Sequence, residues 1–273
     1  MPRNKIIIVV VLYNESLFET NAYKTLLKGY QDSVFVYDNS PIPQHSIAEF
    51  PSNWIYISDP CNSGLSIAYN QAAKYAVRND YEWLFITDQD TIYVPNIIQD
   101  FDLSINEYPE IKLFVPKMCI GNTSQYMSPI DANPIKAKIV DYVPKGVQSL
   151  YEYAPINSGM MINIKAFWKV GGYNENVKVD FSDYQFISRF RRAYNEFYIL
   201  DKTCKQEFSN NIQTPNQKLV RFEKFCESLK CYECADWRES ILIFLVVLRR
   251  TLSLMFYTRS LNPIKIYIKK FIV

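Results

Sequence analysis

The sequence WLFITDQDTIYVP at residues 83–95 begins as an uncharged, largely apolar run and then places two carboxylates two positions apart. The apolar part is typical of a strand that is buried on both faces. Because side chains alternate along a strand, Asp88 and Asp90 point to one side and Gln89 to the other. Two carboxylates this close repel each other unless a positive group lies beside them, and a divalent cation shared with substrate phosphates is the usual solution. A strand-end turn with two solvated aspartates is the alternative.

Short apolar segments alternate with helical patterns on both sides of this stretch. Strands are predicted at 5–11, 33–37, 54–57 and 83–87, and helices at 16–28, 65–76 and 97–105. The first helix would open with a capping box formed by Ser16 and Glu19. The alternation predicts an α/β fold in which a Rossmann-like, mostly parallel central sheet has helices on both faces.

The carboxyl ends of these four predicted strands are all polar. They carry Tyr13-Asn14-Glu15, Asp38-Asn39, the segment 59–64 and Asp88-Gln89-Asp90. In open α/β sheets ligands bind beyond these ends, so we expect the four segments to line one crevice. No Gly-x-Gly-x-x-Gly motif follows the first strand, which argues against a dinucleotide-binding half.

The alternation becomes less regular after residue 110. Strands are predicted at 115–120, 138–143 and 157–164, and a turn at 171–175. A helix is predicted to start within 179–189, with Ser182 or Asp183 at its N-terminal end. A carboxylate there would lie beside unpaired backbone N–H groups and the positive end of the helix dipole, which favours its ionised form. Considered alone, Asp183 is better explained as a helix cap.

The composition is that of a globular protein, with 48% hydrophobic and 21% charged residues among 273. Six scattered cysteines indicate reduced thiols, and Cys231 and Cys234 are better explained as ordinary helix cysteines than as part of a zinc site. His45 is the only histidine, which disfavours His-dependent catalytic triads. The apolar run at 5–11 is too short for a secretory signal, so a cytoplasmic protein is expected.

The basic character of the chain belongs to its C-terminal part. Residues 238–273 carry seven basic residues and one acid, a net charge of +6, whereas the whole chain has +2. Two helical patterns lie between 219 and 258, and the apolar run at 241–248 is too short to span a bilayer. This part is either a basic amphipathic segment lying on the inner face of the cell membrane, or a core-packing helix followed by a solvated tail.

Seven motifs occur in a distinctive order. They are Tyr13-Asn14 after the opening strand, Val36-Tyr37-Asp38-Asn39-Ser40, Asn62-Ser63-Gly64-Leu65-Ser66-Ile67-Ala68-Tyr69-Asn70, Asp88-Gln89-Asp90-Thr91, Asn157-Ser158-Gly159, Gly171-Gly172-Tyr173-Asn174-Glu175, and Asp180-Phe181-Ser182-Asp183 through Arg189. Over residues 5–205 this set resembles the family 2 glycosyltransferases of the GT-A fold. Within them it is most similar to the bacterial rhamnosyltransferase branch, in which Asp-Gln-Asp-Thr is a common form of the metal motif.

The resemblance implies a GT-A catalytic domain at 1–215 and a helical, basic C-terminal extension at 216–273. Residues 1–110 would form the nucleotide-sugar-binding half, and 111–215 the acceptor-binding half. The implied activity is the inverting, metal-dependent transfer of a sugar from a nucleoside diphosphate to a polysaccharide or lipid-linked oligosaccharide in cell-surface glycan synthesis. L-Rhamnose from dTDP-rhamnose is the favoured donor.

The resemblance also implies a role for each motif residue. Asp90 would ligate Mg²⁺ or Mn²⁺, Asp183 would be the general base, and Asp180 would be its reserve. Asp38 would accept hydrogen bonds from the donor's pyrimidine ring, as one of seven nucleotide-sugar-binding residues: Tyr13, Asn14, Asp38, Asn62, Gly64, Asn70 and Asp88. The acceptor or diphosphate side would be lined by Asn157, Ser158, Gly159 and Gln206.

The chain departs from the family pattern at two places. Many members have Glu-Asp at the base, where this chain has Ser182-Asp183. Many also carry a His after a later strand, where this chain has Thr203-Cys204-Lys205-Gln206-Glu207-Phe208. Gln206 is the candidate substitute for that His, and metal occupancy or the grip on the donor would differ accordingly.

Two other functions are compatible with parts of the pattern. A nucleotidyltransferase shares the α/β topology, but it would normally have a Gly-rich loop bearing Lys or Arg after the first strand, and Leu12-Tyr13-Asn14-Glu15-Ser16 lacks one. A non-catalytic module that binds a glycan or a partner enzyme at the membrane would use the carboxylates structurally. Nucleic-acid binding is disfavoured because the positive charge lies on an apolar tail.

Overall fold

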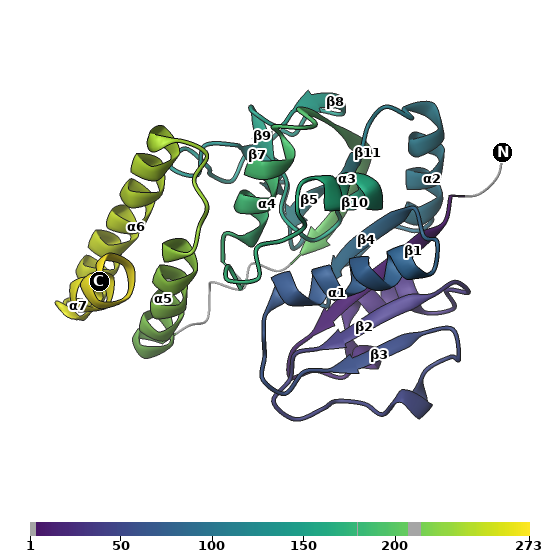
Figure 1. Cartoon of the computed structure of the whole chain (residues 1–273), viewed down its shortest axis with the longest axis horizontal. Coiled ribbons are helices and arrows are strands. Elements are labelled where there is room, and N and C mark those ends of the chain that lie inside the picture. Colours follow the sequence, from purple (N-terminus) through teal and green to yellow (C-terminus); the bar gives the residue numbers. More distant parts are fainter. Residues whose placement is uncertain (1–3, 179, 207–213) are drawn as a thin grey trace.

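A nine-stranded sheet forms the centre of the molecule (Figure 1). The computed structural model describes residues 4–178, 180–206 and 214–273. The strand order is β3-β2-β1-β4-β10-β5-β11-β8, with β6 paired to β5. The strands are β1 (Ile6–Leu12), β2 (Val34–Asp38), β3 (Ile55–Ser58), β4 (Trp83–Asp88), β5 (Leu113–Ile120), β6 (Tyr126–Ser128), β7 (Ile130–Asp131), β8 (Gly146–Ser149), β9 (Tyr153–Ala154), β10 (Met161–Asn163) and β11 (Glu196–Gln206).

Helices cover the sheet and continue beyond it. They are α1 (Leu65–Arg78), α2 (Ile97–Glu107), α3 (Ile164–Lys169), α4 (Ser182–Phe190), α5 (Pro215–Lys230), α6 (Trp237–Thr258) and α7 (Asn262–Tyr267), with single turns η1 (Leu17–Glu19), η2 (Tyr23–Leu27), η3 (Ile47–Glu49) and η4 (Ile268–Ile272). The α1 helix and the α2 helix lie on opposite sides of the sheet.

Strands β3, β2, β1 and β4 run parallel to one another, and β11 runs parallel to β5. Strand β10 lies antiparallel between β4 and β5. The predicted α/β fold with a mostly parallel central sheet is confirmed. After β4 the chain is held against β11 by a bridge between Ile92 and Lys205, which brings the carboxyl ends of the two strands together.

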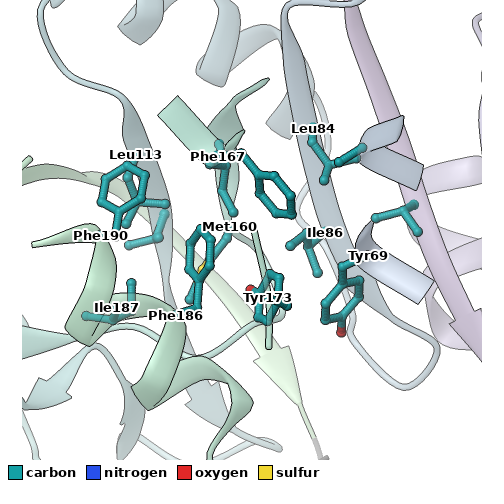
Figure 2. Packing of buried hydrophobic residues seen from close by; sticks show 14 of the residues in the cluster. Tyr69, Leu84, Ile86, Leu113, Met160, Phe167, Tyr173, Phe186, Ile187 and Phe190 are labelled. Carbon is teal, nitrogen blue, oxygen red and sulfur yellow. The ribbon is translucent and has the colours of Figure 1, made fainter. Parts of the chain in front are cut away.

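The alternation along β1 divides the core into two layers. Ile7, Val9 and Val11 pack in one cluster with α1 and α4 residues, whereas Ile8 and Val10 pack in the other with α2 residues. Figure 2 shows the first cluster, in which the rings of Phe167, Tyr173 and Phe186 fill the space between the sheet and α4. Both faces of the strand are therefore buried, as its continuous apolar sequence predicts.

Three of the predicted elements are wrong in detail. The helix expected at 16–28 is two short turns, because Thr20 is extended and its hydroxyl accepts a hydrogen bond from the Tyr23 N–H. The Ser16 side chain makes no cap and instead lies against His45, whose Nε2 accepts a hydrogen bond from the Leu17 N–H. The strand expected at 138–143 is a single bridge at Val140, and that expected at 157–164 is only β10.

The C-terminal helices α5, α6 and α7 lie together at one side of the molecule, beyond α4 (Figure 1). They have a small core of their own, formed by Phe222, Phe225, Cys226, Leu229, Ile243, Val247 and Tyr267. The predicted helical extension is therefore present. The boundary proposed at 215/216 is preceded by 207–213, which lie outside the described residues, and the first residue of α5 is Pro215.

The α6 helix is longer than its apolar run of eight residues suggested. It has 22 residues, and its apolar 18-residue window has a mean hydropathy of 1.7 with 22% of the window buried. By length and composition alone, within the described part of the chain, this one helix could cross a membrane. The run at 241–248 is too short by itself, as expected, but the helix continues beyond Arg250 with further apolar residues.

Candidate functional site

Two carboxylates and one amide meet where β4 and β11 end. The Gln206 Nε2 atom donates to Asp90 Oδ1 at 2.9 Å and to Asp88 Oδ2 at 3.2 Å. The Tyr69 hydroxyl of α1 donates to Asp88 Oδ1 at 3.4 Å. Strand β4 ends at Asp88 and Asp90 lies in the turn that follows, so the two carboxylates share one side through the turn and not through strand alternation. Gln206 joins them from a strand 116 residues further along the chain.

The electrostatics of this cluster favour a cation. Burial, followed by repulsion from Asp90, raises the pKa of Asp88 to about 7. A positive charge beside the two carboxylates would relieve that repulsion. Gln206 Oε1 is buried and has no hydrogen-bond partner, so it is a spare oxygen ligand beside the two carboxylates.

The residues present fit a hard divalent cation, which prefers oxygen ligands and keeps several positions for water and substrate phosphates. Asp88, Asp90 and the Gln206 amide oxygen would hold it. Among the described residues no group of three His, Cys, Asp or Glu side chains lies close enough to form a self-sufficient metal site. Further ligands would therefore come from substrate and solvent.

Asp183 is the second residue of α4, which begins after Phe181 in a left-handed conformation with φ +68°. Its Oδ1 accepts a hydrogen bond from the Tyr184 N–H at 2.8 Å. Burial, with a smaller contribution from the charge of Asp180, raises the pKa of Asp183 to about 6. The helix terminus was expected to favour the ionised form, but burial outweighs it. A carboxylate with this pKa is suited to accept a proton near neutral pH.

Asp180 is bound by two arginines of the C-terminal extension. Its Oδ1 lies 3.2 Å from Arg221 Nη2, and its Oδ2 lies 3.9 Å from Arg250 Nη1. Both carboxylate oxygens already face a guanidinium group. The geometry therefore argues against Asp180 as a reserve base.

Asp38 is held by hydrogen bonds within the protein. Its side chain is fully buried, Oδ1 accepts from the Ser40 N–H, and Oδ2 accepts from the Gln44 N–H and the Tyr56 hydroxyl. Both oxygens are thus used within the protein, and the pyrimidine contact stays a prediction. Asp38 folds the loop that follows β2.

Asp59 was not selected from the sequence, although it opens the polar 59–64 segment. It follows β3 and accepts hydrogen bonds from the Tyr37 hydroxyl at 3.0 Å and from the Ser63 N–H at 2.8 Å. It therefore shapes the loop that leads into α1. The signal available in the sequence was an aspartate directly after a predicted strand.

Asn70 of α1 is also buried, and its side chain binds the turn at residues 171–175. Its Oδ1 accepts from the Tyr173 N–H at 2.9 Å, and its Nδ2 donates to the Tyr173 carbonyl at 2.9 Å and to Glu175 at 3.0 Å. The contact of Asn70 with the nucleotide stays a prediction, and the hydrogen bonds in this structure are all within the protein. The residue fixes the 171–175 turn against α1.

Gly64 is required by a protein contact. Its φ is +106°, and an added Cβ would lie 2.7 Å from the Lys178 carbonyl oxygen. The close approach that glycine permits here is to the Lys178 carbonyl, in the segment before α4. The approach to a nucleotide stays a prediction. Asn62 at the same edge has a positive φ of 48° and is half-buried.

Tyr13 and Asn14 remain at the open edge of the sheet. The Tyr13 side chain is 49% exposed, and its N–H donates to Gln89 Oε1. The Asn14 N–H donates to the Ser40 hydroxyl, and its φ is 54°. An exposed aromatic ring at this edge is available to stack on a nucleotide base.

The motif Asn157-Ser158-Gly159 lies beneath the site. The Ser158 hydroxyl accepts from the Asp88 N–H at 3.2 Å and pairs with the Thr91 hydroxyl at 2.7 Å. The Asn157 amide donates to the Ser182 hydroxyl and accepts from the Tyr173 hydroxyl. Both side chains are buried, and their place on the acceptor or diphosphate side stays a prediction.

Gly159 completes this floor. It has φ +88°, and a Cβ there would meet the Pro116 ring at 2.9 Å. The motif therefore positions both chemical ends of the site: Ser158 holds the backbone of Asp88, and Asn157 holds the start of the helix that carries Asp183. The sequence pointed to these residues, and the structure adds the contacts by which they support the site.

Solved structures with this fold include several glycosyltransferases. The crystal structure of S. aureus TarS has a TM-score of 0.57 and 16% identity, with 88% of this chain and 42% of that chain covered. The complex of S. aureus TarS 1–349 with UDP-GlcNAc has a TM-score of 0.58 and 14% identity, covering 97% and 79%. GalNAc-T7 with UDP, GalNAc and Mn²⁺ has a TM-score of 0.58 and 13% identity, covering 84% and 47%.

At these identities the similarity establishes the GT-A fold alone, and the chain spans less than half the length of the full TarS and GalNAc-T7 chains. A comparison with curated protein sequences gives no match. A family model described as glycosyl transferase family 2 matches residues 7–171. That match spans more than half of the chain and ends at the turn that Asn70 holds. The chain therefore belongs to glycosyl transferase family 2.

Proposed function

We propose that this protein is an inverting, metal-dependent glycosyltransferase that uses a nucleoside diphosphate sugar. The observation that carries the proposal is the cluster of Asp88, Asp90 and Gln206, which lies close enough to Asp183 for the charge of Asp183 to contribute to the raised pKa of Asp88. A cation-binding group and a proton acceptor thus share one site. The family membership supports the transferase class.

In the proposed reaction Asp183 is the catalytic base. It takes the proton of the acceptor hydroxyl as that oxygen forms a bond to the anomeric carbon, while the bond from that carbon to the diphosphate oxygen breaks. Attack opposite the leaving group inverts the anomeric configuration. When bound, the divalent cation would neutralise the diphosphate that leaves. Asp88, Asp90 and Gln206 would hold the cation, with Tyr13 stacked on the base.

The donor proposed is dTDP-rhamnose, which supplies L-rhamnose. Its support is the Asp-Gln-Asp-Thr form of the metal motif at 88–91, which resembles the rhamnosyltransferase branch. UDP-sugars are the competing class, since TarS was solved with UDP-GlcNAc and GalNAc-T7 with UDP and GalNAc. The proposed acceptor is a polysaccharide or a lipid-linked oligosaccharide of the cell surface.

A membrane-facing surface on α6 supports an acceptor carried on lipid. One face of α6 packs into the extension core through Ile243, Val247 and Thr251, which are buried. The opposite face is apolar and exposed, and we call it the outer stripe. Each of its members is at least 41% exposed: Trp237, Ile241, Phe244, Leu245, Leu252 and Phe256.

The charges around the outer stripe select its occupant. Arg238 and Arg249 on the same helix and Arg259 directly after it are exposed, whereas Glu239, the only acid in residues 237–273, is buried. An apolar stripe with a basic border suits the headgroup region of an anionic bilayer. Packing on the protein and binding to a membrane are therefore compatible for α6. One face of the helix packs on the protein, and the opposite face can lie on the cytoplasmic surface of a membrane.

Thermal unfolding tests the proposed function. Purified protein would be heated with dTDP-rhamnose, UDP-GlcNAc or GDP-mannose, each with and without Mn²⁺, because a ligand bound only to the native state raises Tm with the logarithm of its concentration. A metal-dependent rise with dTDP-rhamnose is expected. A rise with a UDP-sugar alone would replace rhamnose as the donor, and no rise with any sugar nucleotide would favour a non-catalytic module.

Incubation with a nucleoside triphosphate and a sugar phosphate covers the other enzyme class. Release of pyrophosphate, with no transfer of sugar to an acceptor, would make the protein a nucleotidyltransferase. The transferase proposal predicts no pyrophosphate, because in that reaction the leaving group is a nucleoside diphosphate.

A further inference from the structure

The residues directly before α4 contact both the start of α1 and the C-terminal extension. On one side the Lys178 carbonyl accepts from the Leu65 N–H, and the Val177 carbonyl accepts from the Ser66 hydroxyl, at the start of α1. On the other side Asp180 is paired with Arg221 of α5 and Arg250 of α6. Three residues after Asp180 comes Asp183.

The extension holds this segment by packing as well as by charge. Phe181 packs against the core formed by α5, α6 and α7, with its ring edge-on to Phe225 at 5.6 Å. The Arg250 guanidinium lies over the Phe225 ring, 4.0 Å from its centroid. The Phe225 ring therefore contacts both Phe181 and Arg250, the arginine that pairs with Asp180.

The extension also contacts α4 further along the helix. The Ser188 hydroxyl donates to Glu239 Oε1 at 2.6 Å, and Tyr232 donates to the same oxygen at 3.1 Å. Glu239 is buried at the first turn of α6 and lies 3.7 Å from Arg191 and 3.6 Å from Arg192. The helix that carries Asp183 is thus fixed at both ends by residues beyond position 214.

We propose that Arg221 and Arg250 are positioning residues of the transferase site, which hold Asp180 and so fix the location and the charge environment of Asp183. We call these three residues the base clamp: Asp180, Arg221 and Arg250. The inference rests on the proposed function only in giving Asp183 the role of base. The extension is then a necessary part of the catalytic site as well as a surface for a membrane.

The clamp has an electrostatic consequence that packing alone would not have. Asp180 is a negative charge near Asp183, and the two arginines offset it. Several other ionisable groups face Asp183, and they remain unchanged in the variants below: Asp88 of β4, Tyr69 of α1, Tyr173 of the turn and Tyr184 of α4. Removing an arginine should therefore make the base harder to ionise, and removing Asp180 should make it easier.

Hydrogen exchange tests the positioning without any substrate. In Arg221→Gln and Arg250→Gln, backbone amides of residues 180–186 should exchange about tenfold faster than in the wild type, because the restraint on local opening is lost. Lys224→Gln is the matched control, as Lys224 is exposed one turn further along α5. Equal exchange in the arginine variants and the control would overturn the proposal. This measurement stands even if no donor is found.

The pH profile of transfer tests the charge environment. Arg250→Gln should move the acid limb of kcat/KM to higher pH by about half a pH unit, and Asp180→Asn should move it to lower pH. The double variant should return towards the wild type. Arg250→Lys should keep the wild-type limb, which separates charge from folding. Shifts of the same sign in both single variants, or loss of transfer in Asp180→Asn alone with normal exchange, would contradict the clamp.

Discussion

Replacing Asn70 by alanine separates a structural role from a nucleotide-binding role. The substitution removes one acceptor and two donor bonds, and it leaves the buried N–H and carbonyl of Tyr173 without their side-chain partner. Each buried backbone group left unsatisfied costs about 1–3 kcal/mol, so the loss of two partners should lower the free energy of unfolding by about 2–6 kcal/mol. For a chain of this size that corresponds to a Tm lower by roughly 5–15 °C.

The assay is calorimetry of Asn70→Ala beside Asn79→Ala. Asn79 is exposed at the end of the same helix, where its amide donates only to the Tyr75 carbonyl. The control should lose less than about 1 kcal/mol. Well below its Tm, Asn70→Ala should still bind the sugar nucleotide with wild-type affinity. An unchanged Tm together with a lost nucleotide affinity would refute the structural role and restore the contact that the resemblance implies.

Four further predictions address the chemistry, the charges and the membrane. Asp90→Ala should abolish the Mn²⁺-dependent part of nucleotide binding in a titration, and unchanged binding would remove Asp90 from the cation site. Asp183→Asn should bind donor normally yet transfer sugar about 10²–10⁴-fold more slowly; in the wild type the rate should fall as pH drops through about 6, where this carboxyl becomes protonated. Without metal, the raised pKa values of Asp88 and Asp183 mean that the native state binds more protons than the unfolded chain between pH 7 and pH 5. The free energy of unfolding should therefore rise as the pH is lowered from 7 to 5. A urea-unfolding midpoint that does not change over this range would contradict the prediction. Leu252→Glu with Phe256→Glu should reduce sedimentation with anionic phosphatidylglycerol vesicles at least tenfold, whereas equal sedimentation would place the membrane contact elsewhere.

The parallel half of the sheet could be predicted from the sequence because its signals are local. Continuous apolar runs, each ended by polar residues, mark the strands β1 to β4 and the edge where they end. The closeness of Asp88 and Asp90 could also be predicted, because the two residues are only two positions apart, although a turn and not strand alternation brings them together. These patterns do not depend on which distant residue a side chain contacts.

The functions of the buried polar residues depended on tertiary contacts. Asn70 meets Tyr173 across 103 positions, and Gln206 meets Asp90 across 116. A motif residue that binds substrate and one that supports its neighbours look alike in sequence, since both are polar and both follow a strand or start a helix. Burial and the hydrogen-bond partner distinguish them, and both come from packing.

The two faces of α6 show the same division. Its composition predicts an apolar, basic segment, with a membrane surface and a protein core as equal alternatives. Only the packed structure assigns Val247 to the core, Phe256 to solvent and Arg250 to Asp180. The physical reason is that hydrophobicity measures how strongly a side chain avoids water, whereas the three-dimensional structure determines which residues it contacts in place of water.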